Sequence, residues 1–407
     1  MTDALDNSRR SSTRALIALL LHLALGLFLV EAGVSLLDDT LGLAFGVHVL
    51  GLIRGLLSLL LFLTSILVYL LCGITPIIPK RFFIPIVLFT PAAQLAMIPF
   101  LIFHYDRVQQ ITWVASLCQI LFGLSILFWI QGTFRFRWPV VRQEHLGSKA
   151  FSGLNLVGFL LVNGFVLLPG VLLYLFVCAS LAVDHFSASF LALRSDGLTI
   201  RAKTYVRGDH KTVRLIPMAH IGEADFYNQI SKSFPTNSVI LLEGVTDNKN
   251  LLKHKLSYKR AARSLGLVEQ PKEFTPPPQG RLRHADVDVE QFSERTIAFL
   301  NLLSLIYSEG LKVEHLLRVL QESEEPLFAE QLWDDLLTKR NANLLKQIEA
   351  ELPGSDVIVV PWGAVHMRGI AEEIQKSGFR LADTQEYQIV HFRSVRNRHL
   401  HPNKKRA

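Results

Sequence analysis

The stretch VIVVPWGAVHMRGI, residues 357–370, decides the fold of the second half of the chain. Its first residues are apolar and rich in β-branched side chains, which is typical of a buried strand. Gly363 then turns the chain, His366 follows, and residues 372–376 have the pattern of a helix. A histidine on the turn leaving a buried strand lies where open α/β sheets bind their ligands, at the carboxyl ends of the strands. The sequence therefore predicts a site at that edge of a sheet.

Strand and helix patterns alternate through the second half of the chain. Apolar runs at 212–218 and 238–242 predict two more buried strands, and 188–206 predicts two strands joined by a turn. This alternation indicates an α/β domain with a largely parallel central sheet, in which the strands of 188–206 can pair antiparallel at one edge. Helices are expected at 223–234, 249–265, 292–307 and within 311–351, a loop at 271–283, and closing strands at 379–382 and 387–392.

The first half of the chain has a different composition. Half of the 407 residues are hydrophobic, and most of this excess lies in residues 15–183, whereas the remainder is mixed like a globular domain. We therefore predict a transmembrane domain at 1–185 and an α/β domain at 186–407 with a basic C-terminal tail. Few ionisable residues fall within the apolar segments, which favours a role in anchoring over one in transport. Five α-helical spans of about 20 residues each are expected at 15–37, 55–74, 82–104, 112–130 and within 153–183.

Loop charges predict the orientation of this α-helical bundle. The arm with Arg9, Arg10 and Arg14 is basic, and so are the second and fourth loops, whereas the first loop is expected to carry Asp38 and Asp39. The positive-inside rule then places the N-terminus in the cytoplasm. Five crossings put the α/β domain on the other side of the cell membrane, in the periplasm if that membrane is the inner one, or outside the cell.

The net charge of +7 does not lead us to expect a nucleic-acid partner, because basic residues that border spans explain part of it and the tail supplies much of the rest. Anionic lipid headgroups of the bilayer are the expected partner of such stretches. The cysteines, Cys72, Cys118 and Cys178, all lie in apolar segments. Neither a disulfide scaffold nor a thiolate zinc site is therefore expected in the α/β domain.

Three of the predicted strands end in residues that can bind a metal. His220 and His366 each follow a strand, and Glu243 comes directly after four apolar residues. If the strands are parallel, these side chains can converge, and two imidazoles with one carboxylate suit a divalent ion such as zinc or manganese. Such an ion activates water and polarises a carbonyl. In the metal-free alternative, one histidine is the general base and Glu243 orients it.

Each of these residues also has an ordinary interpretation. His220 alone is a common turn residue, Arg340 a solvated helix charge and Asn343 a surface side chain. Asp286 and Asp288 have the pattern of helix caps rather than of catalytic groups. Glu243 is harder to explain in this way, because a carboxylate at the end of a buried strand is costly to bury without a partner.

Four stretches resemble the TraB/PrgY/GumN group, which includes the Tiki metalloproteases. They are AHIG at 219–222, LLEG at 241–244, RNANL at 340–344 and GAVHMRGI at 363–370. The resemblance covers roughly residues 212–392 and implies an α/β fold of the erythromycin-esterase/ChaN-like type. It also implies, for some members, metal-dependent peptide hydrolysis. The first motif departs from the family pattern, because Pro217 stands where glycine is usual.

The resemblance implies a role for individual residues. The metal ligands would be His220, Glu243 and His366, the ion zinc, manganese or cobalt, and the catalytic or supporting residues Glu243, Arg340 and Asn343. The predicted function is a membrane-anchored, metal-dependent hydrolase that acts outside the cytoplasm on a peptide or small-molecule substrate. The alternative is a non-catalytic membrane protein that binds a ligand, or regulates, through the same pocket.

Overall fold

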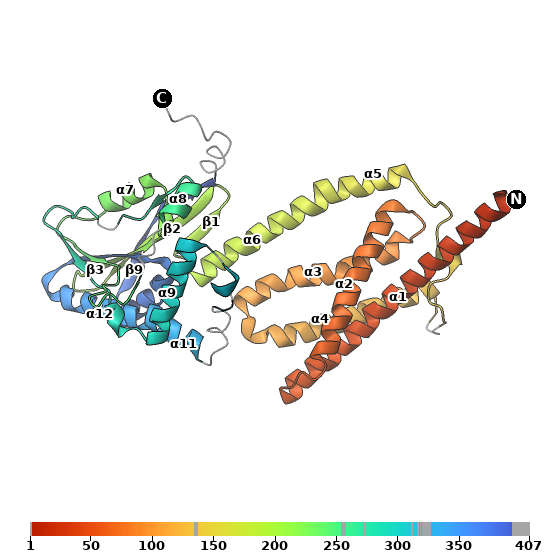
Figure 1. Cartoon of the computed structure of the whole chain (residues 1–407), viewed down its shortest axis with the longest axis horizontal. Helices are drawn as coiled ribbons and strands as arrows, with labels where there is room; N and C mark the ends of the chain where they lie inside the picture. The colour runs from red at the N-terminus through yellow and green to blue at the C-terminus, as the bar shows by residue number, and fades with distance from the viewer. Residues whose placement is uncertain are drawn as a thin grey trace, which may run out of the picture. The chain divides into compact units, whose positions relative to one another are not determined.

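The structure is a computed structural model with two compact units, Met1–Leu181 and Ala182–Ala407 (Figure 1). The first unit is helical and the second contains both helices and strands. The structure describes residues 2–133, 137–253, 258–271, 274–310, 312–315, 317, 319 and 327–392. Of residues 2–10 and 309 it describes only the backbone.

The first unit confirms the predicted spans. Within the described part of the chain, five helices are long and apolar enough to cross a membrane. Large apolar side chains on them face outward, such as Leu52 and Leu154, which are 80% and 85% exposed. Because so much apolar surface needs hydrocarbon around it, the protein is a membrane protein. The spans are α1 (Thr2–Phe45), α2 (Gly51–Ile74), α3 (Lys80–Phe103), α4 (Val108–Gln131), and α5 (Gly153–Val162) running through the π-helical turn Asn163–Leu167 into α6 (Leu168–Phe186).

The first helix is longer than the sequence predicted. We expected Asp38 and Asp39 in the first loop, but α1 continues to Phe45 and buries both carboxylates. Arg54 of α2 supplies the missing partner, because its Nη1 lies 2.5 Å from Asp39 Oδ1. Two consecutive acidic residues suggest the end of a span. Their burial depends on Arg54 of another helix, and the local sequence pattern does not reveal that contact.

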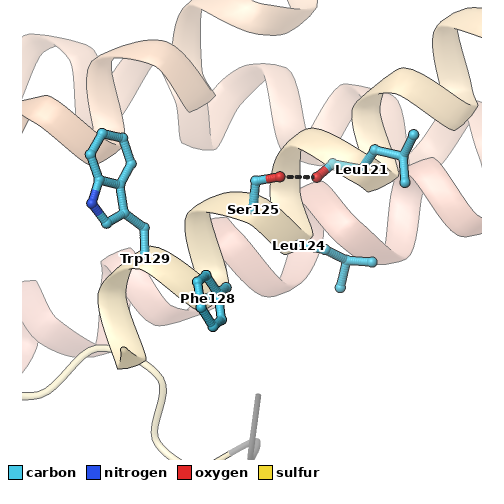
Figure 2. Close-up of a pocket in the computed structure, with 5 residues that line it drawn as sticks. All are labelled: Leu121, Leu124, Ser125, Phe128 and Trp129. Carbon is cyan, nitrogen blue, oxygen red and sulfur yellow. Dashed lines mark hydrogen bonds between the residues drawn. The ribbon is translucent and has the colours of Figure 1, made fainter. Parts of the chain in front are cut away.

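One hollow of the membrane unit lies on the outer side of α4 (Figure 2). Its lining is apolar apart from Ser125, whose hydroxyl donates to the backbone oxygen of Leu121 at 2.7 Å. Trp129 beside it is 66% exposed. Because its one hydroxyl is already bonded within the helix, this hollow offers a surface for acyl chains and no group for chemistry.

The second unit is built around a mixed sheet with strand order β1-β2-β3-β8-β5-β7, and β9 pairs with β2 off this path. The four strands from β3 to β7 are parallel to one another, and β1, β2 and β9 pair antiparallel. This confirms the predicted α/β class with its antiparallel edge. The strands are β1 (Leu191–Arg194), β2 (Gly197–Val206), β3 (Thr212–Met218), β5 (Val239–Leu242), β7 (Arg281–His284), β8 (Val357–Gly363) and β9 (Arg380–His391).

Helices cover both faces of this sheet, with α7 (Ala224–Lys232) on one side and α12 (Lys339–Glu351) on the other (Figure 1). Alternate residues of a strand point to opposite faces, so Ile358 and Val360 of β8 join the core beneath α12 and α13 (Met367–Lys376). Val359 joins the core beneath α7. The remaining elements are α8 (Lys259–Ser264), α9 (Glu294–Glu309), α11 (Phe328–Trp333), the π-helical turn Asp334–Thr338, and a small sheet of β4 (Ile221–Gly222) with β6 (Val268–Glu269).

Three local predictions were wrong. The expected loop at 271–283 contains most of β7, whose sequence RLRH is too short and too basic to suggest a strand. The two closing strands are one strand, β9. Of the basic helix at 249–265, only α8 is helical in the described part, and residues 254–257 lie outside it, as does the basic tail after 392.

Candidate functional site

The strand ends that carry the predicted metal ligands lie at one edge of the sheet. β3, β8 and β5 are neighbours and parallel, so their carboxyl ends point the same way. Glu243 follows β5 directly, His220 follows β3, and His366 ends the 3₁₀ turn after β8. Two of these residues meet face to face, because Glu243 Oε1 lies 3.6 Å from His366 Nε2.

Glu243 is held at both of its oxygens. Its Oε1 accepts a hydrogen bond from Arg340 Nη2 at 2.7 Å, and its Oε2 accepts one from the backbone N–H of Gly363 at 2.5 Å. A Cβ atom at Gly363 would lie only 3.3 Å from Oε2. Glycine at this turn therefore lets the β8 backbone come close to the carboxylate. The two hydrogen bonds offset the free-energy cost of burying Glu243 after β5.

Arg340, near the start of α12, is anchored by a second carboxylate. Its Nε and Nη2 donate to Asp286 at 2.9 and 2.7 Å, a two-pronged pair that fixes the guanidinium plane. The side chain of Asp286 is completely buried and also accepts from the N–H groups of Gly244 and Val287, each at 2.9 Å. Burial opposes the charge of Arg340, but its hydrogen bonds and charge pairing with Asp286 and Glu243 outweigh burial and raise its pKa.

Of the two predicted helix caps nearby, one is wrong and one is confirmed. Asp286, which we interpreted as a helix cap, is the anchor of Arg340. Asp288 does cap, because it accepts from the N–H of Glu290 at 3.0 Å at the start of a 3₁₀ turn. The sequence offers a signal for Asp286, since it follows a strand parallel to β5, but that strand was not recognised.

His366 is buried and uncharged. Its Nδ1 lies 2.7 Å from the amide oxygen of Asn341, and because an amide oxygen only accepts, Nδ1 carries the proton and Nε2 has the lone pair. Burial, followed by the positive charge of Arg340, lowers the pKa of His366 to about 4. At neutral pH, therefore, an unprotonated imidazole nitrogen lies 3.6 Å from the Glu243 carboxylate.

The predicted supporting residue Asn343 has a different position from Asn341. Its side-chain nitrogen donates to the backbone oxygen of Ala285 at 2.9 Å and so holds the segment after β7. Asn341, which sequence reasoning missed, is the residue that orients His366. A Cβ atom at Gly369 would lie 3.0 Å from Asn341 Nδ2, so this glycine of α13 makes room for the orienting amide.

His220 lies on the same rim but does not join the other two. Its ring stacks on Tyr258, with centroids 4.9 Å apart and planes at 5°. Its charge is close enough to contribute to lowering the pKa of His366, and Glu243 contributes to raising the pKa of Tyr258, for which burial is the main cause. In the described part of the chain, no three His, Cys, Asp or Glu side chains are grouped to hold a metal ion.

The donor atoms of Glu243 and His366 nevertheless fit a divalent ion. Two ligands of one tetrahedral zinc ion are about 3.4 Å apart, close to the 3.6 Å between Oε1 and Nε2. A ligating histidine commonly donates its other ring N–H to a carbonyl oxygen, as His366 does to Asn341. Two of the three predicted ligands are thus suitably placed. The third, His220, would have to turn its ring away from Tyr258 to join them.

The buried neutral state of His366 predicts a pH dependence of stability. In the unfolded chain the imidazole has its ordinary pKa of 6.5, whereas in the folded protein its pKa is about 4. Between these two values the unfolded chain binds the proton more readily, so protons favour unfolding. The free energy of unfolding is therefore unaffected above pH 6.5 and falls by up to about 3 kcal/mol as the pH approaches 4. Urea unfolding of the full-length protein in detergent, followed by circular dichroism, should show this loss in the wild type and not in His366→Gln. Equal pH slopes in the two proteins would contradict it.

Comparison with family models, with curated proteins and with solved structures finds no match for this chain. The similarity to the TraB/PrgY/GumN group therefore stays a prediction that rests on the four stretches quoted above.

Proposed function

We propose that the protein is a membrane-anchored hydrolase whose reaction centre is formed by Glu243, His366 and Arg340. The observation that carries the proposal is the facing pair of His366 Nε2 and Glu243 Oε1, 3.6 Å apart. Because the His366 proton is on Nδ1, two electron-rich atoms face each other with no hydrogen between them. Such a pair is stabilised by a cation or a proton, and it is suited to take a proton from water.

A divalent metal ion, zinc, manganese or cobalt, is part of the proposal. Glu243 and His366 would hold it, and His220 would complete the ligand set once its ring turns away from Tyr258. Such an ion would activate water for attack on a carbonyl and polarise that carbonyl. The resemblance to the TraB/PrgY/GumN group, some of whose members hydrolyse peptides with a metal, supports the same assignment.

The protein's own residues supply fixed charge and orientation. Asp286 holds the Arg340 guanidinium against Glu243, so that its positive charge can steady negative charge developing on a substrate oxygen. Asn341 keeps the His366 ring in the tautomer with Nε2 unprotonated. Asn343 acts further out, by holding the backbone beside Asp286.

We further propose that this centre lies outside the cytoplasm. An odd number of spans separates the basic N-terminal arm from the α/β unit, and the arm is expected to stay in the cytoplasm. A substrate in the periplasm or outside the cell, either a peptide or a small molecule with a hydrolysable carbonyl, follows from this location.

The test is elemental analysis and hydrolysis by the full-length protein in detergent, with fluorogenic peptides and p-nitrophenyl esters as probes. We expect a bound divalent metal and turnover in the wild type, and loss of both in His366→Ala. The matched control is His210→Ala, because His210 is exposed in the turn before β3, at the opposite end of that strand. Activity that is unchanged in folded His366→Ala would remove the proposed mechanism.

One observation favours the second candidate, a non-catalytic binding or regulatory protein. Both Glu243 oxygens already accept hydrogen bonds, and the His220 ring is engaged by Tyr258. A pocket completed in this way could hold a ligand without a metal. Purified protein that has no metal and no turnover, but binds a small molecule tightly at this rim, would favour this candidate over the hydrolase.

A further inference from the structure

The membrane unit contains a buried carboxyl group that neither anchoring nor the proposed hydrolase uses. Glu31 of α1 is only 8% exposed. Its Oε1 accepts hydrogen bonds from the hydroxyls of Ser35 at 3.0 Å and Ser58 at 2.8 Å, and its Oε2 accepts one from Gln119 Nε2 at 2.7 Å. Three helices, α1, α2 and α4, thus direct a polar group at one carboxyl.

This carboxyl lies deep in the bundle. Gln119 stands midway along α4, about 17 Å from either end at the rise of an α-helix, and it touches Glu31. The hydrocarbon core of a bilayer is about 30 Å thick, so Glu31 is near its middle. In the described part of the chain, its hydrogen-bond partners are neutral and no basic side chain pairs with it. An ionised carboxyl in such a place is costly, and a bound proton removes that cost.

Polar side chains follow one another from Glu31 toward one end of the bundle. Ser35 and Asp39 follow on α1 at successive turns, the same face that Glu31 occupies. Ser116, one turn from Gln119 on α4, donates to Asp39 at 3.3 Å. Toward the other end, the next turns of α1 present buried apolar residues, Phe28 and Leu25. The polar path therefore runs from Glu31 in one direction only.

The outer end of this path carries two buried acidic residues with basic partners. Asp38 and Asp39 are buried, and Arg54 pairs with both, at 3.7 and 2.5 Å. His48 in the turn after α1 lies 3.1 Å from Asp38 and is half-exposed. Both aspartates thus have basic partners, whereas Glu31 has none among the described residues.

The residues of α4 that contact this polar path, Ser116 and Gln119, are neutral. Asp106 and Arg107, in the 3₁₀ turn before α4, lie at the same end of the bundle as His48, but they are exposed and pair with each other at 3.7 Å. The basic residues of α3, Lys80 and Arg81, are in its first turn, where Lys80 bonds to Asn155. Asp38, Asp39, Arg54 and His48 are therefore the titratable or charged groups that face Glu31 along this path.

We propose that Glu31 is a proton-binding site within the membrane unit, and that its proton exchanges with water at the end of the bundle where α1 turns into α2. The ligand is a proton held by the carboxyl, whose oxygens have Ser35, Ser58 and Gln119 as hydrogen-bond partners. The membrane unit then does more than anchor, because it contains a group whose charge can change. This inference does not depend on the hydrolase proposal.

The test is infrared spectroscopy of the full-length protein in lipid nanodiscs at neutral pH. We expect the carbonyl-stretch band of a protonated carboxyl, shifted on exchange into D₂O and lost in Glu31→Gln. Glu144→Gln, at a residue whose side chain is 66% exposed, is the control and should keep the band. Absence of the band in the wild type, or its persistence in Glu31→Gln, would overturn the proposal.

A milder variant protects the test against misfolding. Ser58→Ala removes one hydrogen-bond donor to Glu31 and leaves the carboxyl in place. Because a carboxyl with fewer hydrogen bonds absorbs at higher frequency, we expect the band to move upward in Ser58→Ala. Ser125→Ala, on the outer side of α4, should leave the frequency unchanged. An unmoved band in folded Ser58→Ala would assign it to another carboxyl and count against Glu31.

Discussion

Changing Asp286 to alanine is expected to lower the free energy of unfolding of the α/β unit by about 3–5 kcal/mol. The side chain of Asp286 is completely buried, and it accepts both prongs of the Arg340 guanidinium and two backbone N–H groups. Removing it leaves the Arg340 guanidinium, whose side chain is 14% exposed, with Glu243 as its one carboxylate partner in the described part of the chain. Urea unfolding of the full-length protein in detergent, followed by circular dichroism, measures the loss.

The control for this prediction is Asp356→Ala. Asp356 also pairs with a cation, Lys211 at 2.8 Å, but its side chain is 80% exposed. Solvent screens such a pair, so the expected loss is about 0–1 kcal/mol. Similar small losses in both variants would mean that Asp286 does not anchor Arg340 in the way described.

Changing Glu243 to glutamine is expected to lower kcat by about 10²–10⁴-fold if the protein is a hydrolase. The amide keeps the size of the side chain and can still accept from the N–H of Gly363, but it removes the negative charge that faces His366 Nε2. Since binding of the rest of the substrate does not depend on that charge, KM should change less than kcat. Steady-state kinetics with the peptide or ester found to turn over would measure both.

Glu351→Gln is the matched control for this variant. Glu351 on α12 is another buried carboxylate held by arginines, Arg281 and Arg283 of β7, and it lies away from the strand ends that carry the site. Both variants lose a buried ion pair, and only Glu243→Gln changes the proposed centre. Equal losses of activity per folded molecule would show that stability, not chemistry, is responsible.

The sequence alone predicted the edge of the sheet at which the candidate site lies. Apolar runs ending at Glu243 and shortly before His366 indicate parallel strands, and parallel strands present their carboxyl ends together. This part was predictable because a strand's period and its last residue are local properties of the chain. The five spans were predictable for the same reason, since length and hydropathy decide whether a helix can cross hydrocarbon.

The partners of these residues could not be predicted in the same way. Asp286 and Glu243 share Arg340 although they come from different strands, and the strand before Asp286 has no apolar pattern. Whether Asn341 or Asn343 reaches His366 depends on the rotation of α12 relative to α13, which two amides so close in sequence do not reveal. The burial of Asp39 likewise depends on Arg54 of another helix.

The pairing of β2 with β9 has a consequence for synthesis of the chain. Gly197 of β2 lies opposite His391 of β9, and the pairing continues to Val206 opposite Arg380. The second strand after the last membrane helix is therefore completed by one of the last described segments of the polypeptide. This contact has a high sequence separation and forms slowly. While the ribosome is still translating, the spans can already insert, but one side of β2 stays open until β9 emerges. Translation of β9, rather than membrane insertion, therefore sets the earliest moment at which this unit can finish folding.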